Sequence, residues 1–196
     1  MADVAPILGY LFVMSITPGP NNLMLTASGV NFGFTRTMPH MLGIILGLSI
    51  QTYLTALGLG VLFTEVPIVR EGLKFVGVAY LLWMSWKIVG AQVANASEGA
   101  RPLRSYEATG FQFVNPKAWI MTSTLSTLFL PTQLTPALGG LYLVAILVLV
   151  HLPCISVWAL FGSGLKRVLV EERPRRIFNL VMCVLLLATA VAIFWQ

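Results

Sequence analysis

The stretch Thr17-Pro18-Gly19-Pro20-Asn21-Asn22 interrupts an otherwise apolar run from Ala5 to Ala27. Each proline removes a backbone N–H donor and clashes with the carbonyl group four residues earlier, so a continuous α-helix does not accommodate this stretch. In a soluble protein the same residues would form a turn. Here the apolar flanks together have the length of a membrane span. The sequence therefore predicts a membrane helix that is broken near its middle.

The composition also indicates an integral membrane protein. The chain has 196 residues, of which 57% are hydrophobic and 10% are charged, and its mean hydropathy is +0.85. Soluble domains carry about 25% charged residues. The length favours one transmembrane domain, residues 1–196, over two independent domains.

Six segments have the composition of spanning helices, which need roughly 20 mostly apolar residues. This pattern predicts an all-α membrane fold. A polar connection is expected over residues 31–38, and the longest connection, about 95–103, separates two halves of three helices, 1–94 and 104–196. The six segments are 5–28, 39–63, 67–89, 108–130, 136–162 and 176–195.

The basic residues are distributed unevenly over the predicted loops. Nine fall on one side of the membrane and two, Arg70 and Lys74, on the other. This bias is the positive-inside signal, and it predicts that both termini face away from the cytoplasm. The net charge of +5 then reflects topology, and no nucleic-acid partner is expected. The nine residues are Arg36, Lys87, Arg101, Arg104, Lys166, Arg167, Arg173, Arg175 and Arg176.

A second break, Phe113-Val114-Asn115-Pro116-Lys117, lies inside the fourth predicted helix. Counted from Tyr106 on the basic side, Lys117 lies about 16 Å into the membrane at helical rise, which is roughly half the hydrocarbon thickness. The first break lies at a similar depth, so the two breaks are expected to meet at the midplane. Broken first helices in two oppositely oriented halves are typical of inverted-repeat transporters.

The ionisable residues near the middle of the spans are Lys117 and His151, and all seven acidic residues fall in loops or at helix ends. Helix N-termini at the breaks favour a carboxylate, and free carbonyl groups favour an ammonium group. This combination suits a small zwitterion and disfavours a cationic substrate such as lysine. Lys117 either contacts the substrate carboxylate or bonds carbonyl groups released by the first break. The residues expected to bind substrate are Pro18, Gly19, Pro20, Asn21, Asn22, Gln51, Asn115, Pro116, Lys117 and Ser123.

Two groups are candidates for proton coupling. Lys117 qualifies because burial favours the neutral form of lysine. His151 either relays a proton or bonds a carbonyl group that Pro153 leaves free. His40, near the cytoplasmic end of the second predicted helix, is expected at the membrane interface.

The breaks and their surroundings resemble the LysE/RhtB family of amino-acid exporters over essentially the whole chain. The motifs that carry the resemblance are Pro18-Gly19-Pro20-Asn21-Asn22, Gly33-Phe34, Gly43-x-x-x-Gly47 and Asn115-Pro116-Lys117-Ala118. Gln112-Phe113-Val114-Asn115 and Leu125-Ser126-Thr127 are similar to the branch that exports cysteine and O-acetylserine. One departure is Gln112, where many members of the family have asparagine.

The resemblance implies a secondary active exporter of small neutral amino acids or their derivatives, such as cysteine, O-acetylserine, homoserine or threonine. It implies alternating access, proton antiport and a place in the bacterial cytoplasmic membrane. The expected partners are the amino-acid substrate, protons and membrane lipids, and a homo-oligomer is compatible with the sequence. No cofactor, metal or catalytic residue is expected, and the nucleotide-binding pattern G-x-x-x-x-G-K-[ST] is absent from the chain.

Two alternatives to amino-acid export remain open. The chain could export another small metabolite, or it could be a passive channel or a scaffold. A membrane thiol-redox protein is disfavoured because Pro153-Cys154 has no counterpart in the other half. An intramembrane enzyme is disfavoured because no Ser/His/Asp set and no metal-ligand cluster occurs at helical spacing.

Overall fold

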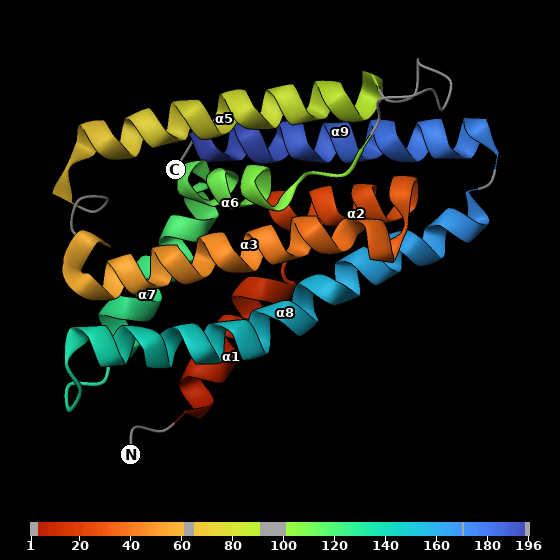
Figure 1. The fold of residues 1–196 in the computed structure, drawn as a ribbon. Coiled ribbons are helices and arrows are strands. Elements are labelled where there is room, and N and C mark those ends of the chain that lie inside the picture. Colours follow the sequence, from red (N-terminus) through yellow and green to blue (C-terminus); the bar gives the residue numbers. More distant parts are fainter. Residues whose placement is uncertain (1–3, 61–64, 91–100, 170, 195–196) are drawn as a thin grey trace.

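The structure, a computed structural model, describes residues 4–60, 65–90, 101–169 and 171–194. Over these residues the protein is all-α, which confirms the expected class. Helices α3, α5, α8 and α9 run along the long axis of the bundle (Figure 1). The elements are α1 (Ala5–Ile16), α2 (Pro20–Phe32), α3 (Phe34–Leu54), the π-helical turn η1 (Thr55–Leu59), α5 (Pro67–Gly90), α6 (Ser105–Val114), α7 (Pro116–Phe129), α8 (Pro136–Val168) and α9 (Glu172–Phe194).

Three stretches of the described chain are by themselves long and apolar enough to cross a membrane: Phe34–Leu59, Pro136–Lys166 and Glu172–Val191. Helix α1 is apolar but shorter, as expected for one part of a broken span. The arrangement of six spans as two inverted repeats stays a prediction. Most of the predicted linker, about 95–103, and both extreme termini lie outside the described residues.

Both predicted helix breaks are present. Helix α1 ends at Ile16 and α2 begins at Pro20; α6 ends at Val114 and α7 begins at Pro116. Proline is favourable in the first turn of a helix, where its missing N–H has no intrahelical role. The residue before proline is driven towards an extended conformation, and Asn115 adopts it, with φ −89° and ψ 108°. The prolines thus end one helix and start the next.

The polar connection predicted over residues 31–38 is wrong. Helix α2 continues to Phe32 and α3 begins at Phe34, so Gly33 alone joins them. Its φ of 85° is accessible to glycine because glycine has no Cβ. Pro39 lies inside α3. One glycine in a left-handed conformation reverses the chain here, which removes the need for a longer loop.

Small residues allow the helices to approach closely. A Cβ on Gly43 would meet the Ser105 carbonyl group, and one on Gly47 would meet Gln112, so both glycines of the predicted motif pack against α6. This motif therefore serves packing within the chain. Helices α2 and α8 are equally close, because a Cβ on Gly162 would overlap the Thr26 carbonyl group. Lipid tails are as apolar as the helix surfaces, so the hydrophobic effect does not drive helices together in a membrane. Close backbone packing at small residues stabilises their association instead.

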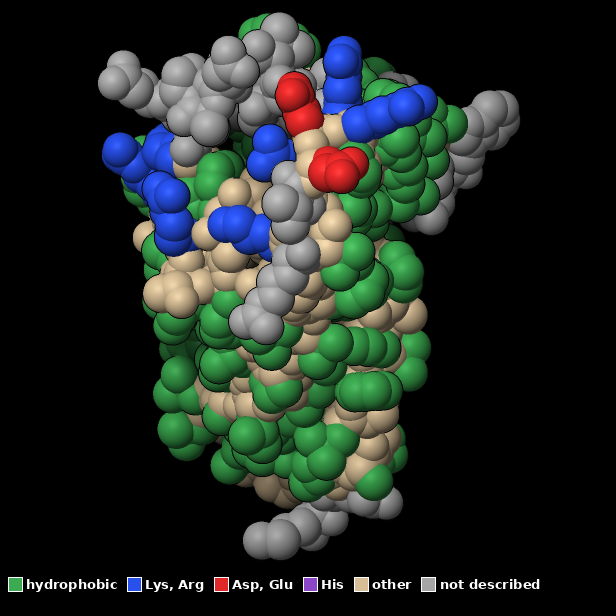
Figure 2. Space-filling view, turned by 90° about the vertical axis from the view of Figure 1, so that its right-hand side faces the viewer, with side chains coloured by type: hydrophobic (Ala, Val, Ile, Leu, Met, Phe, Trp, Pro, Cys, Tyr) green, Lys and Arg blue, Asp and Glu red, His purple; other side chains and the backbone are tan. Residues whose placement is uncertain are grey.

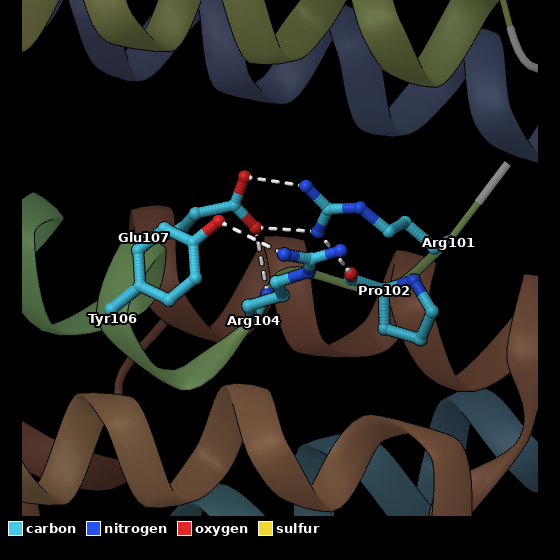
Figure 3. A network of polar contacts seen from close by, with 5 residues as sticks. All are labelled: Arg101, Pro102, Arg104, Tyr106 and Glu107. Atoms are coloured by element: carbon cyan, nitrogen blue, oxygen red, sulfur yellow. Dashed lines mark hydrogen bonds and ion pairs between the residues drawn. The ribbon is translucent and has the colours of Figure 1, made fainter. Parts of the chain in front are cut away.

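The start of α6 is fixed by a polar network (Figure 3). Glu107 accepts the backbone N–H of Arg104 at 2.7 Å and pairs with both terminal nitrogens of Arg101 at 2.6 and 2.8 Å. The hydrogen bonds to Glu107 raise the pKa of the Arg101 guanidinium. A carboxylate in the first turn also complements the helix dipole.

Several basic side chains gather at one end of the bundle. Figure 2 faces the end at which α8 ends and α9 begins, and Lys and Arg side chains cluster over part of it beside hydrophobic surface. The exposed basic residues Arg36, Lys166 and Arg173 belong to the adjoining ends of α3, α8 and α9. This grouping agrees with the predicted basic side of the membrane, whereas the orientation itself stays a prediction.

We expect the Gly162→Ala variant to be less stable than the parent. Overpacking a close contact costs about 1–3 kcal/mol, which in a chain of this size lowers the unfolding midpoint by roughly 2–10 °C. Thermal unfolding of the detergent-purified protein measures this. Gly164→Ala is the matched control, because a Cβ there meets nothing within 4 Å. Equal midpoints for the two variants would contradict the close α2–α8 contact.

Candidate functional site

The two breaks lie against each other, and Lys117 joins them. Its Nζ donates to the carbonyl oxygens of Thr17 at 3.0 Å and Pro18 at 3.3 Å, and to the Thr17 hydroxyl at 3.0 Å. These oxygens lie just beyond the C-terminus of α1, where a helix carries partial negative charge. Gly19 permits the approach, because a Cβ there would lie 3.0 Å from Lys117 Nζ. Lys117 thus bonds the carbonyl groups released by the first break, which is one of the two roles predicted for it.

Side chains of α2 and α8 also bond carbonyl groups at the end of α1. Asn22 Nδ2 donates to the carbonyl oxygens of Ser15 and Thr17, both at 2.9 Å. Trp158 of α8 donates from Nε1 to the Ile16 carbonyl oxygen at 3.2 Å. Backbone groups inside a bilayer must be satisfied within the protein, and these side chains do so for α1.

A pair of side-chain amides connects α2 to α6. Asn21 Nδ2 donates to Gln112 Oε1 at 2.8 Å, and Gln112 Nε2 donates back to Asn21 Oδ1 at 3.1 Å. Gln51 of α3 reaches the Gln112 carbonyl oxygen at 3.5 Å. The amide of Gln112 is therefore used in holding the two broken spans together.

The N-termini of α2 and α7 differ. In α7, the Asn115 side chain accepts the N–H of Lys117 at 3.1 Å, and its carbonyl oxygen accepts those of Ala118 and Trp119 at 3.0 and 3.2 Å. In α2, Gly19 is the N-cap residue and supplies no side-chain cap. Only the helix that follows the second break is closed by its own cap.

A cavity lies between the two breaks. It is bordered by five helices, and its wall combines apolar side chains with amides, one lysine and one histidine. None of the described residues in this wall is acidic. The lining residues are Met14, Ser15, Gly19, Pro20, Asn21, Asn22, Leu48, Asn115, Lys117, Ala118, Met121 and His151.

His151 enters the cavity wall from α8. Its Nδ1 lies 2.7 Å from the Ser15 hydroxyl oxygen, and its Nε2 has no hydrogen-bond partner among the described residues although the side chain is 5% exposed. The alternative in which His151 bonds a carbonyl group freed by Pro153 is wrong for this structure. His40 is buried in the protein, 1% exposed, and its expected depth at the membrane interface stays a prediction.

Most of the residues expected to bind substrate come together. Gly19, Pro20, Asn21, Asn22, Asn115 and Lys117 line the cavity, as does His151. Pro18 and Pro116 belong to the breaks themselves. Gln51 and Ser123 lie outside the lining, within a group of buried polar side chains between α3, η1 and α7, in which Thr55 Oγ1 lies 2.8 Å from Ser126 Oγ.

Five lining residues were not singled out from the sequence: Met14, Ser15, Leu48, Ala118 and Met121. Four are apolar residues in apolar helices, so their positions carry no local signal. Ser15 precedes the first break by less than one turn, but a serine in a membrane helix commonly bonds its own backbone. Its pairing with His151 depends on the packing of α1 against α8.

Residues 12–196 match the family described as LysE type translocator. The chain belongs to the LysE family. It is 32% identical over 192 residues to proteins named cysteine/O-acetylserine efflux protein from Salmonella typhimurium and from Escherichia coli strain K12, covering 95% of this chain and 94% of theirs. No solved structure gives a significant match. Membership of the LysE family places the chain among membrane transporters, so the expectation of a transporter and not an enzyme is confirmed.

The amide pair between Asn21 and Gln112 predicts energetic coupling. We compare Asn21→Ala, Gln112→Ala and the variant that carries both substitutions. The double variant should lose about 1 kcal/mol less stability than the two single losses add up to, because the second substitution removes an amide that has already lost its partner. Thermal unfolding of the four proteins in detergent measures the coupling.

The control cycle combines Gln112→Ala with Asn31→Ala. Asn31 pairs with Asn179, and its bonds are separate from those of Gln112, so these two effects should add. Additivity in the Asn21–Gln112 cycle as well would mean that the amide pair does not hold the two broken spans together.

Proposed function

We propose that this LysE-family protein exports small neutral amino acids or their derivatives, with cysteine and O-acetylserine as the first substrates to test. The relatives named cysteine/O-acetylserine efflux protein support this substrate class, since they match nearly the full length of the chain at 32% identity. The protein would work as a secondary transporter by alternating access in the bacterial cytoplasmic membrane.

The observation that carries the proposal is the chemistry of the cavity between the breaks. The described residues of its wall offer one ammonium group, backbone and side-chain amides and a histidine, and none of them carries a carboxylate. A zwitterion with an uncharged side chain leaves no net charge to compensate. A lysine-like substrate would bring a second positive charge beside Lys117, and a buried charge without a partner is costly. The apolar residues Met14, Leu48 and Met121 suit a small uncharged side chain.

The topology that we propose consists of six spans in two inverted repeats. The broken pair α1–α2 corresponds to the broken pair α6–α7, α3 corresponds to α8, and α5 corresponds to α9. The packing supports this correspondence, because α3 contacts α6 and α7 while α8 contacts α1 and α2. The basic end of the bundle would face the cytoplasm, with both termini on the opposite side.

Proton coupling would involve Lys117 and His151, the ionisable side chains among the described residues of the cavity wall. Lys117 holds the end of α1 through its ammonium group, so loss of its proton would weaken the contact between the two broken spans. A proton would in this way change the arrangement of the elements that carry the substrate. Lys117 and His151 are our candidates for that link.

In inside-out vesicles with an imposed proton gradient, we expect accumulation of labelled cysteine and O-acetylserine and no accumulation of lysine. An uncoupler should abolish the accumulation. Uptake of lysine at a comparable rate would contradict the zwitterion site, because the described cavity wall contains no acid to balance the extra charge. Equal flux with and without the gradient would instead indicate a passive channel.

We expect Lys117→Met to reduce gradient-driven cysteine uptake to the level of vesicles that lack the protein. The substitution keeps the length of the side chain and removes the ammonium group that contacts the first break. Lys166→Met is the control, because Lys166 is exposed at the basic end of the bundle. Wild-type rates in Lys117→Met, at matched protein levels, would remove Lys117 from the mechanism.

A further inference from the structure

We propose that the substrate binds in one fixed orientation, with its carboxylate at the open N-terminus of α2 beside Lys117 and its ammonium group at Asn22 Oδ1 and His151 Nε2. This inference rests on the proposed function and assigns the two ends of the zwitterion to different sides of the cavity. The sequence motifs made both breaks candidates for the carboxylate, and the structure separates them.

The carboxylate end follows from the unequal helix termini. Helix α7 has acceptors for its first N–H groups, all supplied by Asn115. In α2, Pro20 has no N–H, the first helical hydrogen bond is from Leu23 to the Gly19 carbonyl oxygen, and the described residues supply no acceptor for the N–H groups of Asn21 and Asn22. The N-termini of both α2 and α7 border the cavity, but among the described residues the unused N–H donors belong to α2, where the positive end of the helix dipole adds to them.

Lys117 strengthens this end. Its ammonium group borders the same cavity and packs over Gly19, the N-cap residue of α2. The oxygens that it contacts, on Thr17 and Pro18, are neutral, so its charge is not cancelled by any acid in the described cavity wall. A carboxylate placed at the α2 terminus would complement that charge.

The ammonium end follows from the acceptors that remain. The carbonyl groups at the end of α1 are occupied by Lys117, Asn22 and Trp158, so they are not open to a substrate. Two other acceptors in the wall lack partners among the described residues. Asn22 uses its nitrogen for Ser15 and Thr17 and leaves its oxygen unbonded, and its side chain is 4% exposed. His151 Nε2 is likewise without a partner at 5% exposure.

The tautomer of His151 that fits this role carries its proton on Nδ1 and donates it to the Ser15 hydroxyl oxygen, 2.7 Å away. Nε2 is then a lone-pair acceptor. Because buried polar atoms are rarely without a partner, the unbonded His151 Nε2 indicates a hydrogen-bond donor from a ligand, and the Asn22 oxygen offers a second acceptor in the same wall. Ser15 is a positioning residue, since it fixes the ring of His151 and does not contact the substrate.

The test uses three thiol compounds that share one side chain. Cysteine has both charged groups, 3-mercaptopropionate has only the carboxylate, and cysteamine has only the ammonium group. Binding of labelled cysteine to the full chain in lipid nanodiscs, under reducing conditions, and competition by the two analogues give three affinities for each protein. The proteins compared are the wild type, Lys117→Met and His151→Leu.

We expect Lys117→Met to weaken cysteine and 3-mercaptopropionate by about tenfold to a hundredfold, the usual value of a charge-assisted hydrogen bond, and to leave cysteamine unchanged or tighter. His151→Leu should weaken cysteine and cysteamine and leave 3-mercaptopropionate unchanged. The ligand that each variant still binds normally shows that the variant is folded.

The inference is overturned if the pairing is reversed, if each variant weakens both analogues equally, or if neither variant changes any affinity. It is also overturned if the wild type binds cysteine and neither analogue competes, because the two ends would then not bind at separate places. Failure of the wild type to bind cysteine at all would overturn the proposed function, and this inference with it.

Discussion

Proline interrupts two membrane helices, and the packing of the neighbouring helices follows from that interruption. A broken helix leaves carbonyl and N–H groups that water cannot satisfy inside a bilayer. At the end of α1 these carbonyl groups are bonded by side chains from α2, α7 and α8, namely Asn22, Lys117 and Trp158. The helices must pack around the break to supply these partners, and the glycine contacts of α2 with α8 and of α3 with α6 permit that packing.

The same interruption produces the candidate site. The carbonyl groups at the end of α1 are already hydrogen-bonded within the protein, so they hold the structure together. The N-terminus of α7 at the second break is likewise capped by Asn115. Among the described residues that line the cavity, the N–H groups at the N-terminus of α2, Asn22 Oδ1 and His151 Nε2 have no hydrogen-bond partner. The first break thus brings polar groups into an apolar helical bundle, and the described residues of the cavity wall include no carboxylate.

Much of this arrangement follows from local sequence, because proline acts through its own ring and its missing donor. The two breaks, the all-α class and the clustering of Asn21, Asn22, Asn115 and Lys117 are predictable from motif and depth alone. The predicted polar connection over residues 31–38 failed because one glycine with positive φ at Gly33 reverses the chain. The burial of His40 could not be predicted, because hydropathy gives the depth of a residue in the membrane and not the side of the helix that it occupies.

Local sequence specifies that the helices break, where they break and that one lysine lies at the second break, since these are properties of single residues and their distance along a span. Which groups at the breaks remain available depends on how the helices pack. Lys117 bonds α1, Asn21 bonds Gln112, and Ser15 bonds His151, and each of these contacts joins residues more than 90 positions apart. Hydrogen bonds between distant segments depend on packing geometry, which no local pattern specifies.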